Sequence, residues 1–97
     1  MINNFRSYQL ALELYKLCRH KKLPRFLKDQ LERSASSVVL NLSEGSARVS
    51  TKERARFYVI AFASLREVQA LIDMEESLSD LSAKADVLGA HLFKLTH

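Results

Sequence analysis

The chain has 97 residues, of which 47% are hydrophobic and 27% are charged, and this balance excludes a disordered chain. The length predicts a single domain over residues 1–97, and the scarcity of Gly (two) and Pro (one) favours long helices over short strands. The formal net charge of +4 is unevenly spread, because residues 1–56 hold 12 Lys or Arg and 5 Asp or Glu, whereas residues 57–97 hold 3 and 6. The front half is therefore the basic half.

The first predicted helix runs from about Phe5 to Arg19. Because the stretch MINNFRSYQLALELYK is charged and has no continuous apolar core, neither a signal peptide nor a membrane span is expected. The apolar side of this helix is expected to hold Tyr8, Ala11, Leu12, Leu14, Tyr15 and Cys18. Cys18 is the only cysteine, which excludes an intrachain disulfide and a cysteine-rich zinc site and predicts a buried, inert thiol in a reducing, cytoplasmic setting.

The second predicted helix begins at LPRF, where Pro24 suits a first helical turn, and it ends near Glu44. Gly45 is expected to form a left-handed cap at its carboxyl terminus.

Two more helices complete the chain. Ser50 and Glu53 have the spacing of a capping box at the start of the third helix, which is predicted to reach about Glu76. Its apolar stripe comprises Phe57, Tyr58, Ala61, Leu65, Val68, Leu71 and Ile72. The break SLSD precedes a shorter helix over about residues 81–95. Because short connections join long helices, the sequence predicts an all-α, antiparallel up-down-up-down four-helix bundle.

The second helix carries an unusual polar stripe. At about 100° per residue, five polar residues fall within roughly 80° of one another. This polar stripe comprises Gln30, Arg33, Ser37, Asn41 and Glu44. Apolar residues border it on one side, namely Leu27, Leu31, Ala35, Val38 and Leu42, and Leu40 borders it on the other.

Two interpretations of the polar stripe are open. A solvated face is the simpler one, although such a face more usually carries Lys and Glu than Ser and Asn. The favoured alternative encloses the stripe between helices or subunits, where buried polar groups need partners. Arg54 and Ser64 on the third helix are the expected neighbours of Ser37. In this hypothesis the stripe sets helix register and assembly rather than chemistry.

The segments LPRFLKDQLERSASSVVLNLSEGSAR and SLREVQ resemble the four-helix-bundle protein family encoded within intervening sequences of bacterial 23S rRNA genes. The shared positions, within roughly residues 5–76, are Gln30, Arg33, Ser37, Asn41, Glu44, Gly45, Ser64, Leu65 and Glu67. The resemblance implies a bundle that assembles into a ring of identical subunits, commonly a pentamer. It also implies kinship with accessory proteins of diversity-generating retroelements, which are basic and cooperate with reverse transcriptase and nucleic acid. It implies no established biochemical role.

No catalytic, metal or cofactor site is expected. The serines of the second helix lack a nearby His to act as a base. The three histidines, His20, His91 and His97, are spread along the chain without metal-ligand spacing and are expected at the surface. The turn EGSAR lacks the Gly-Lys-Ser/Thr ending of a phosphate loop.

Two basic clusters make nucleic-acid binding a functional hypothesis. The first-connection cluster comprises Lys16, Arg19, Lys21, Lys22, Arg25 and Lys28, and the second-connection cluster comprises Arg48, Lys52, Arg54 and Arg56. In the predicted bundle the third connection shares an end with the first, so four acids are expected to neutralise the first-connection cluster, namely Asp73, Glu75, Glu76 and Asp80. Phe26 and Phe57 are expected in the core, which leaves base stacking unsupported. The predicted binding is therefore to the phosphate backbone of RNA or DNA, with little sequence selectivity.

Three further interpretations are open. Charge runs commonly form a solvated, solubilising surface. The chain is alternatively a protein-interaction scaffold, for example an accessory subunit for a reverse transcriptase, without direct nucleic-acid binding. The third is a protein with little selected biochemical activity beyond being carried by its genetic element. A salt series separates these classes, because phosphate binding weakens steeply with ionic strength and apolar assembly does not.

Overall fold

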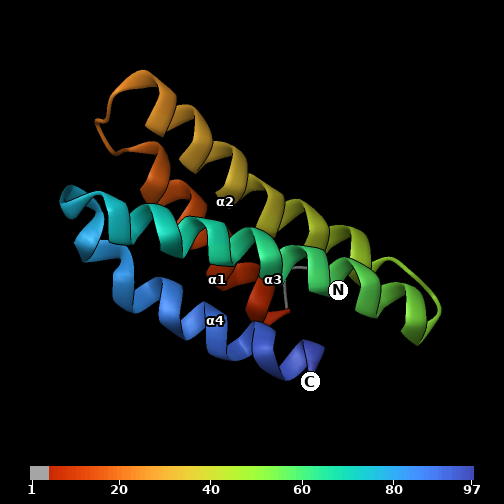
Figure 1. The fold of residues 1–97 in the computed structure, drawn as a ribbon. Helices are drawn as coiled ribbons and strands as arrows, with labels where there is room; N and C mark the ends of the chain where they lie inside the picture. Colours follow the sequence, from red (N-terminus) through yellow and green to blue (C-terminus); the bar gives the residue numbers. More distant parts are fainter. Residues whose placement is uncertain (1–4) are drawn as a thin grey trace.

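The computed structural model describes residues 5–97, which form four long α-helices. The helices are α1 (Arg6–Arg19), α2 (Arg25–Ser46), α3 (Thr51–Met74) and α4 (Ser82–Thr96), with a 3₁₀ helix, η2 (Glu76–Leu81), between the last two. Successive helices run in opposite directions, and α1 contacts α4 as well as α2, so the bundle is closed (Figure 1). The predicted four-helix bundle is confirmed. None of the helices in residues 5–97 combines the length and the apolar character needed to cross a membrane.

The connection between α3 and α4 differs from the expected open break. The third helix ends at Met74, two residues before the predicted Glu76, and the SLSD segment continues as η2. Leu78 and Leu81 are both 1% exposed and close this end of the core, which explains why the segment is tightly wound rather than extended.

The core is formed by one apolar stripe from each helix. Its largest fully buried side chains are Leu14, Leu31, Leu42, Leu65, Leu78, Leu81, Leu88, Leu92, Val38, Val68 and Cys18. Burial raises the pKa of the Cys18 thiol to about 11. The predicted buried thiol is thus confirmed.

Gly45 does not form the predicted left-handed cap. Helix α2 continues to Ser46, and no glycine in residues 5–97 has a positive φ. Gly45 is instead buried against α3, where an added Cβ would lie 2.7 Å from Tyr58 Cε1 and 3.1 Å from Phe57 Cβ. The glycine is therefore required by close helix packing and not by backbone conformation.

The serine half of the predicted capping box is present at the start of α3. Ser50 Oγ accepts a hydrogen bond of 3.1 Å from the backbone N–H of Glu53. At the start of α2, Pro24 occupies the N-cap position, one residue before the first helical residue Arg25.

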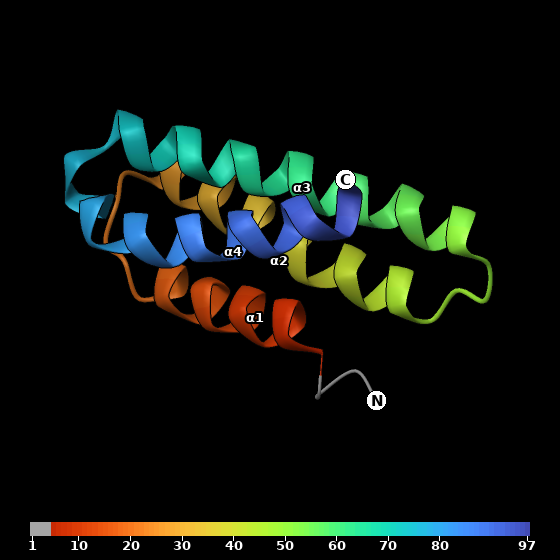
Figure 2. The ribbon, with the colours of Figure 1, turned by 90° about the horizontal axis from the view of Figure 1, so that it is seen from below.

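The two central helices are longer than the outer pair. Helices α2 and α3 have 22 and 24 residues, whereas α1 and α4 have 14 and 15. The α2–α3 hairpin therefore projects beyond the start of α1 and the end of α4 (Figure 2). The Phe5 ring lies 5.8 Å from the Tyr58 ring and marks where α1 begins beside α3. Residues 46–57 form the projecting end, which we call the hairpin tip.

Candidate functional site

The polar stripe of α2 joins this helix to α3. Ser37 Oγ lies 2.7 Å from Ser64 Oγ, and the Gln30 side-chain amide donates a hydrogen bond to the Glu67 carboxylate. Asn41 Nδ2 donates to the backbone oxygen and the hydroxyl of Ser37, at 2.8 and 3.1 Å. Ser37, Asn41 and Gln30 are half-buried, so these contacts provide the partners that enclosed polar groups require.

The rest of the stripe does not take part in this contact. Arg33 is exposed. Glu44 is also exposed and forms an ion pair with Arg48, which lies four residues later, just beyond the end of α2. Contrary to the expectation from the sequence, Arg54 does not contact Ser37. Its guanidinium donates instead to the backbone oxygens of Arg48 and Val49, at 3.0 and 3.1 Å, because Arg54 lies in the first turn of α3, close to the α2–α3 connection.

Beside the polar contacts, the outer face of α2 and α3 exposes large apolar side chains. Phe26 is 72% exposed, Leu40 is 65% exposed and Met74 is 71% exposed. The prediction that Phe26 belongs to the core is wrong, because its position on α2 lies on the side that turns away from α1 and α4. The prediction is also wrong for Phe57, which is half-buried beneath the Arg48 guanidinium and is not among the residues packed against the core in residues 5–97.

The spacing on this outer face has a heptad period. Phe26, Arg33 and Leu40 are seven residues apart on α2, as are Ile60, Glu67 and Met74 on α3, so each set follows one line along its helix. A groove of about 330 Å³ separates the two lines near one end, lined by Phe26, Leu27, Gln30, Glu67, Ala70, Leu71 and Met74. We call this surface the α2–α3 face.

The first-connection cluster is partly neutralised. Lys21 Nζ lies 2.6 Å from Asp80 Oδ1, and this contact holds the pKa of the Asp80 carboxyl below its usual value. Lys28 Nζ donates to the backbone oxygens of Arg19 and Lys21, at 2.6 and 2.5 Å, and lies 3.3 Å from Glu32. Of the four acids expected to neutralise the cluster, Asp80 alone pairs with it among residues 5–97. Asp73, Glu75 and Glu76 form no ion pair with it.

The second-connection cluster lies at the hairpin tip. Arg48 pairs with Glu44, and its guanidinium carbon lies 4.9 Å from the centre of the Phe57 ring. Lys52 and Arg56 are exposed, and neither forms an ion pair within the described part of the chain. Three cations of the tip, Lys52, Arg54 and Arg56, thus form no ion pair with a carboxylate of residues 5–97, and the tip also carries the exposed Glu53.

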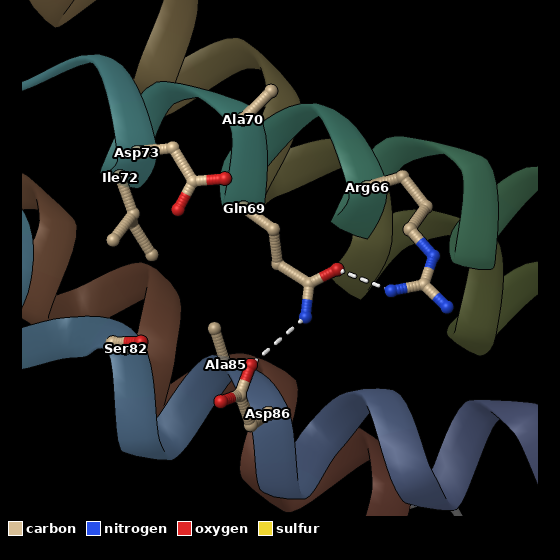
Figure 3. Close-up of a pocket in the computed structure, with 8 residues that line it drawn as sticks. All are labelled: Arg66, Gln69, Ala70, Ile72, Asp73, Ser82, Ala85 and Asp86. Atoms are coloured by element: carbon tan, nitrogen blue, oxygen red, sulfur yellow. Dashed lines mark hydrogen bonds between the residues drawn. The ribbon is translucent and has the colours of Figure 1, made fainter.

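A polar groove of about 360 Å³ between α3 and α4 was not predicted (Figure 3). Gln69 bridges its two sides, because Oε1 accepts from Arg66 at 2.8 Å and Nε2 donates to Asp86 at 3.3 Å. Arg66, Gln69 and Asp73 are three and four residues apart and therefore share one side of α3. This polar spacing is the feature of the sequence from which the groove could have been predicted. Within residues 5–97, no group of three or more His, Cys, Asp or Glu could hold a metal ion.

The histidines are separated in the structure. His20 is exposed at the α1–α2 connection, whereas His91 lies within α4, half-buried, with Nδ1 3.0 Å from the Val87 oxygen. His97 stacks on Phe93 with 3.8 Å between ring centres. The predicted surface location is thus correct for His20 and His97 and only partly so for His91.

A family model described as 23S rRNA-intervening sequence protein matches residues 5–92. The chain belongs to this family. The match covers α1 to α3 and most of α4, beyond the segment whose motifs carry the sequence resemblance. No curated protein and no solved structure matches the chain. In this member of the 23S rRNA-intervening sequence protein family, Ser64 and Glu67 on α3 contact Ser37 and Gln30 on α2.

Proposed function

We propose that this protein is a non-enzymatic, self-associating bundle of the cytoplasm that binds the phosphate backbone of RNA or DNA with little sequence selectivity. The observation that carries the proposal is the projecting hairpin tip, where Lys52 and Arg56 are exposed without an ion pair in residues 5–97. Binding to nucleic acid is favoured when cations displace the counterions condensed on phosphates, and cations already paired with carboxylates contribute less.

The chemistry of the tip supports backbone contact rather than base readout. Phe57 is the aromatic residue of the tip, and it is half-buried beneath the Arg48 guanidinium. A base therefore has no exposed ring on which to stack at the tip, and the exposed side chains there include the cations Lys52 and Arg56.

Self-association is proposed through the α2–α3 face. Exposed apolar patches of this kind are typical of protein interaction sites, and the heptad spacing suits helices of neighbouring subunits. The family resemblance favours a ring of identical subunits, a homopentamer. Such an assembly repeats the positive tip around its axis and strengthens the electrostatic attraction for nucleic acid.

Fluorescence anisotropy with labelled RNA and DNA over a salt series tests the binding. For wild type, the logarithm of the affinity should fall linearly with the logarithm of salt concentration, with a slope of about 0.7–0.9 for each phosphate contacted. The double variant Lys52→Glu/Arg56→Glu should bind more weakly and show a shallower slope. The control Arg66→Glu/Lys94→Glu makes the same change in net charge on α3 and α4, outside the tip, at two exposed cations that form no ion pair in residues 5–97. Equal losses in the two variants, or no binding by wild type at low salt, would contradict the proposal.

A second candidate function is a scaffold for another protein, such as a reverse transcriptase. The exposure of Phe26, Leu40 and Met74 favours this alternative, because the same face would suit a different polypeptide. Light scattering discriminates the two uses of the face. Leu40→Glu should reduce the mass of a wild-type oligomer while the far-ultraviolet circular dichroism is retained, whereas a purified wild-type monomer would favour the scaffold.

A further inference from the structure

The end of the bundle opposite the hairpin tip has an open hollow of about 600 Å³ at the α1–α2 connection. This volume lies within the range of about 300–1,000 Å³ that small-ligand sites occupy. The basic side chains that line it are Arg19, Lys21, Lys22, Arg25 and Lys28, together with the His20 imidazole, and Asp29 is the acid among the lining residues. The hollow is therefore strongly positive.

Two of these cations shape the hollow and are already engaged. The Lys28 ammonium joins the backbone oxygens of Arg19 and Lys21 to the Glu32 carboxylate, and it thereby holds the end of α1 against α2. Lys21 reaches across to Asp80 at 2.6 Å and to the Ser77 oxygen at 3.3 Å, which ties the connection to η2. These contacts give the hollow a preformed wall and leave its other cations available.

The available cations are Arg19, Lys22 and Arg25. Arg19 and Lys22 are exposed and form no ion pair in residues 5–97. Arg25 Nε is 4.0 Å from Asp29 Oδ2, and its side chain is 92% exposed, so this contact is weak. Arg19, Lys22 and Arg25 thus border one hollow, where Asp29 lines the surface and the other two nearby carboxylates, Glu32 and Asp80, are paired with Lys28 and Lys21.

The backbone adds to the positive potential. Helix α2 begins at this hollow, its N-cap Pro24 makes no side-chain hydrogen bond, and its first turn holds no acidic residue. The first backbone N–H groups of a helix carry a partial positive charge that acidic residues usually offset. Here this partial charge adds to the positive potential of the Arg and Lys side chains, and those side chains by themselves define the site.

We infer that the hollow binds a compact anion that carries two or more phosphate groups, such as the polyphosphate of a nucleotide or the 5′ end of an RNA strand. Several cations spread over one hollow suit an extended polyanion, whereas a single phosphate would meet only part of the lining. The lining offers Arg and Lys and no Phe, Tyr or Trp. The site therefore recognises phosphate and is indifferent to the base. It lies at the other end of the bundle from Lys52 and Arg56, so it is independent of the function proposed for the hairpin tip.

Isothermal titration with tripolyphosphate at low salt tests the inference. Wild type should bind, and Arg19→Gln/Arg25→Gln should weaken the affinity by at least about tenfold, since charge-assisted hydrogen bonds to phosphate are lost. The control Arg66→Gln/Lys94→Gln removes the same charge from exposed positions of α3 and α4 that do not line the hollow, and it should bind as wild type does. Asp29→Asn should tighten binding, because it removes the opposing carboxylate, and a purely structural role for these residues predicts no such gain. Absence of wild-type binding, or an equal loss in the control, would overturn the inference.

Further arms separate this site from the tip and identify the source of the phosphate. The variant Lys52→Glu/Arg56→Glu should retain tripolyphosphate binding, whatever happens to its binding of long nucleic acid. ATP and GTP should bind equally well if the ligand is a nucleotide tail, and a 5′-triphosphorylated RNA should bind more tightly than either if the ligand is a strand end. A 5′-hydroxyl RNA of the same sequence that competes with tripolyphosphate as strongly as the 5′-triphosphorylated RNA would refute recognition of a terminal polyphosphate.

Discussion

Replacing Gly45 with Ala should destabilise the protein even though Ala is the better helix former. The substitution lies within α2, where Ala is favoured over Gly by at most about 1 kcal/mol. Against this gain stands the contact with α3. The new Cβ would lie 2.7 Å from Tyr58 Cε1 and 2.9 Å from Tyr58 Cδ1, distances at which one of the two groups must move.

The groups that meet the new Cβ cannot easily move away from it. Phe57 Cβ, at 3.1 Å, is attached directly to the backbone of α3 and cannot rotate away. The Tyr58 ring lies 5.8 Å from the Phe5 ring, centre to centre, so its movement disturbs a second packing contact. Overpacking of this kind costs about 1–3 kcal/mol. Because Phe57 cannot rotate away and Tyr58 is packed on Phe5, the cost lies in the upper part of this range, about 2–3 kcal/mol. After the helix-propensity gain of about 1 kcal/mol, the free energy of unfolding should fall by about 1–2 kcal/mol, which lowers Tm by about 4–16 °C for a domain of this size.

Thermal unfolding followed by circular dichroism at fixed protein concentration measures this effect, and Gly89→Ala is the matched control. An added Cβ at Gly89 would lie 3.4 Å from Gln69 Nε2 and 3.7 Å from Leu65 Cδ2, which are ordinary contacts. Gly89→Ala should therefore raise Tm, because the gain in helix propensity of about 1 kcal/mol is unopposed. A Gly45→Ala variant as stable as wild type would refute the reasoning.

Three further predictions concern stability and reactivity. Ser34→Ala should raise the free energy of unfolding in urea by about 1 kcal/mol, because Ser34 Oγ is buried without a hydrogen-bond partner; a loss of stability would show that the hydroxyl has a favourable interaction. Ser37→Ala and Ser64→Ala should each cost about 1 kcal/mol, and the double variant should cost less than the two together, since they remove the same 2.7 Å contact. Strict additivity would exclude that coupling. The Cys18 thiol should react with a thiol reagent at pH 8 only as the protein unfolds, because it is fully buried and its pKa is raised from 9.0 to about 11. The stabilisation from keeping this thiol neutral is fully present below pH 9 and is lost as the pH rises to 11, because the unfolded chain ionises first. Rapid labelling of the folded protein would contradict this prediction.

The sequence predicted where the cations of the candidate site lie in the bundle, but not all of the groups that they contact. The sequence placed Lys21 at the same end of the bundle as Asp80, and the structure shows the two in contact at 2.6 Å. It did not predict that Lys28 would be engaged by backbone oxygens or that Arg54 would cap the α2–α3 connection. Long, flexible cationic side chains reach many acceptors, so sequence position restricts their neighbourhood but not their partner.

The misplacement of Gly45 and Phe26 has a different cause. The sequence context of Gly45 suits a left-handed cap, and the reason for its presence lies on another helix, in the Tyr58 ring. Phe26 is apolar and lies next to Leu27, but the two point about 100° apart on α2, and Leu27 alone packs against the core. The apolar character of a residue does not show whether its side chain faces the core or the outside of the bundle.

The sequence by itself determined the four helices, their order, the cap at Ser50 and the burial of Cys18. These features follow from local hydrophobic periodicity and from side-chain contacts with the nearby backbone, which do not depend on the rest of the fold. The sequence also predicted the contact between Ser37 and Ser64. Only the tertiary structure decided that Gln30 of the polar stripe meets Glu67, that the α2–α3 face leaves Phe26 exposed and that a positive hollow forms at the α1–α2 connection. Those features depend on how each helix is rotated about its axis, and that rotation is set by the packing of all four helices together.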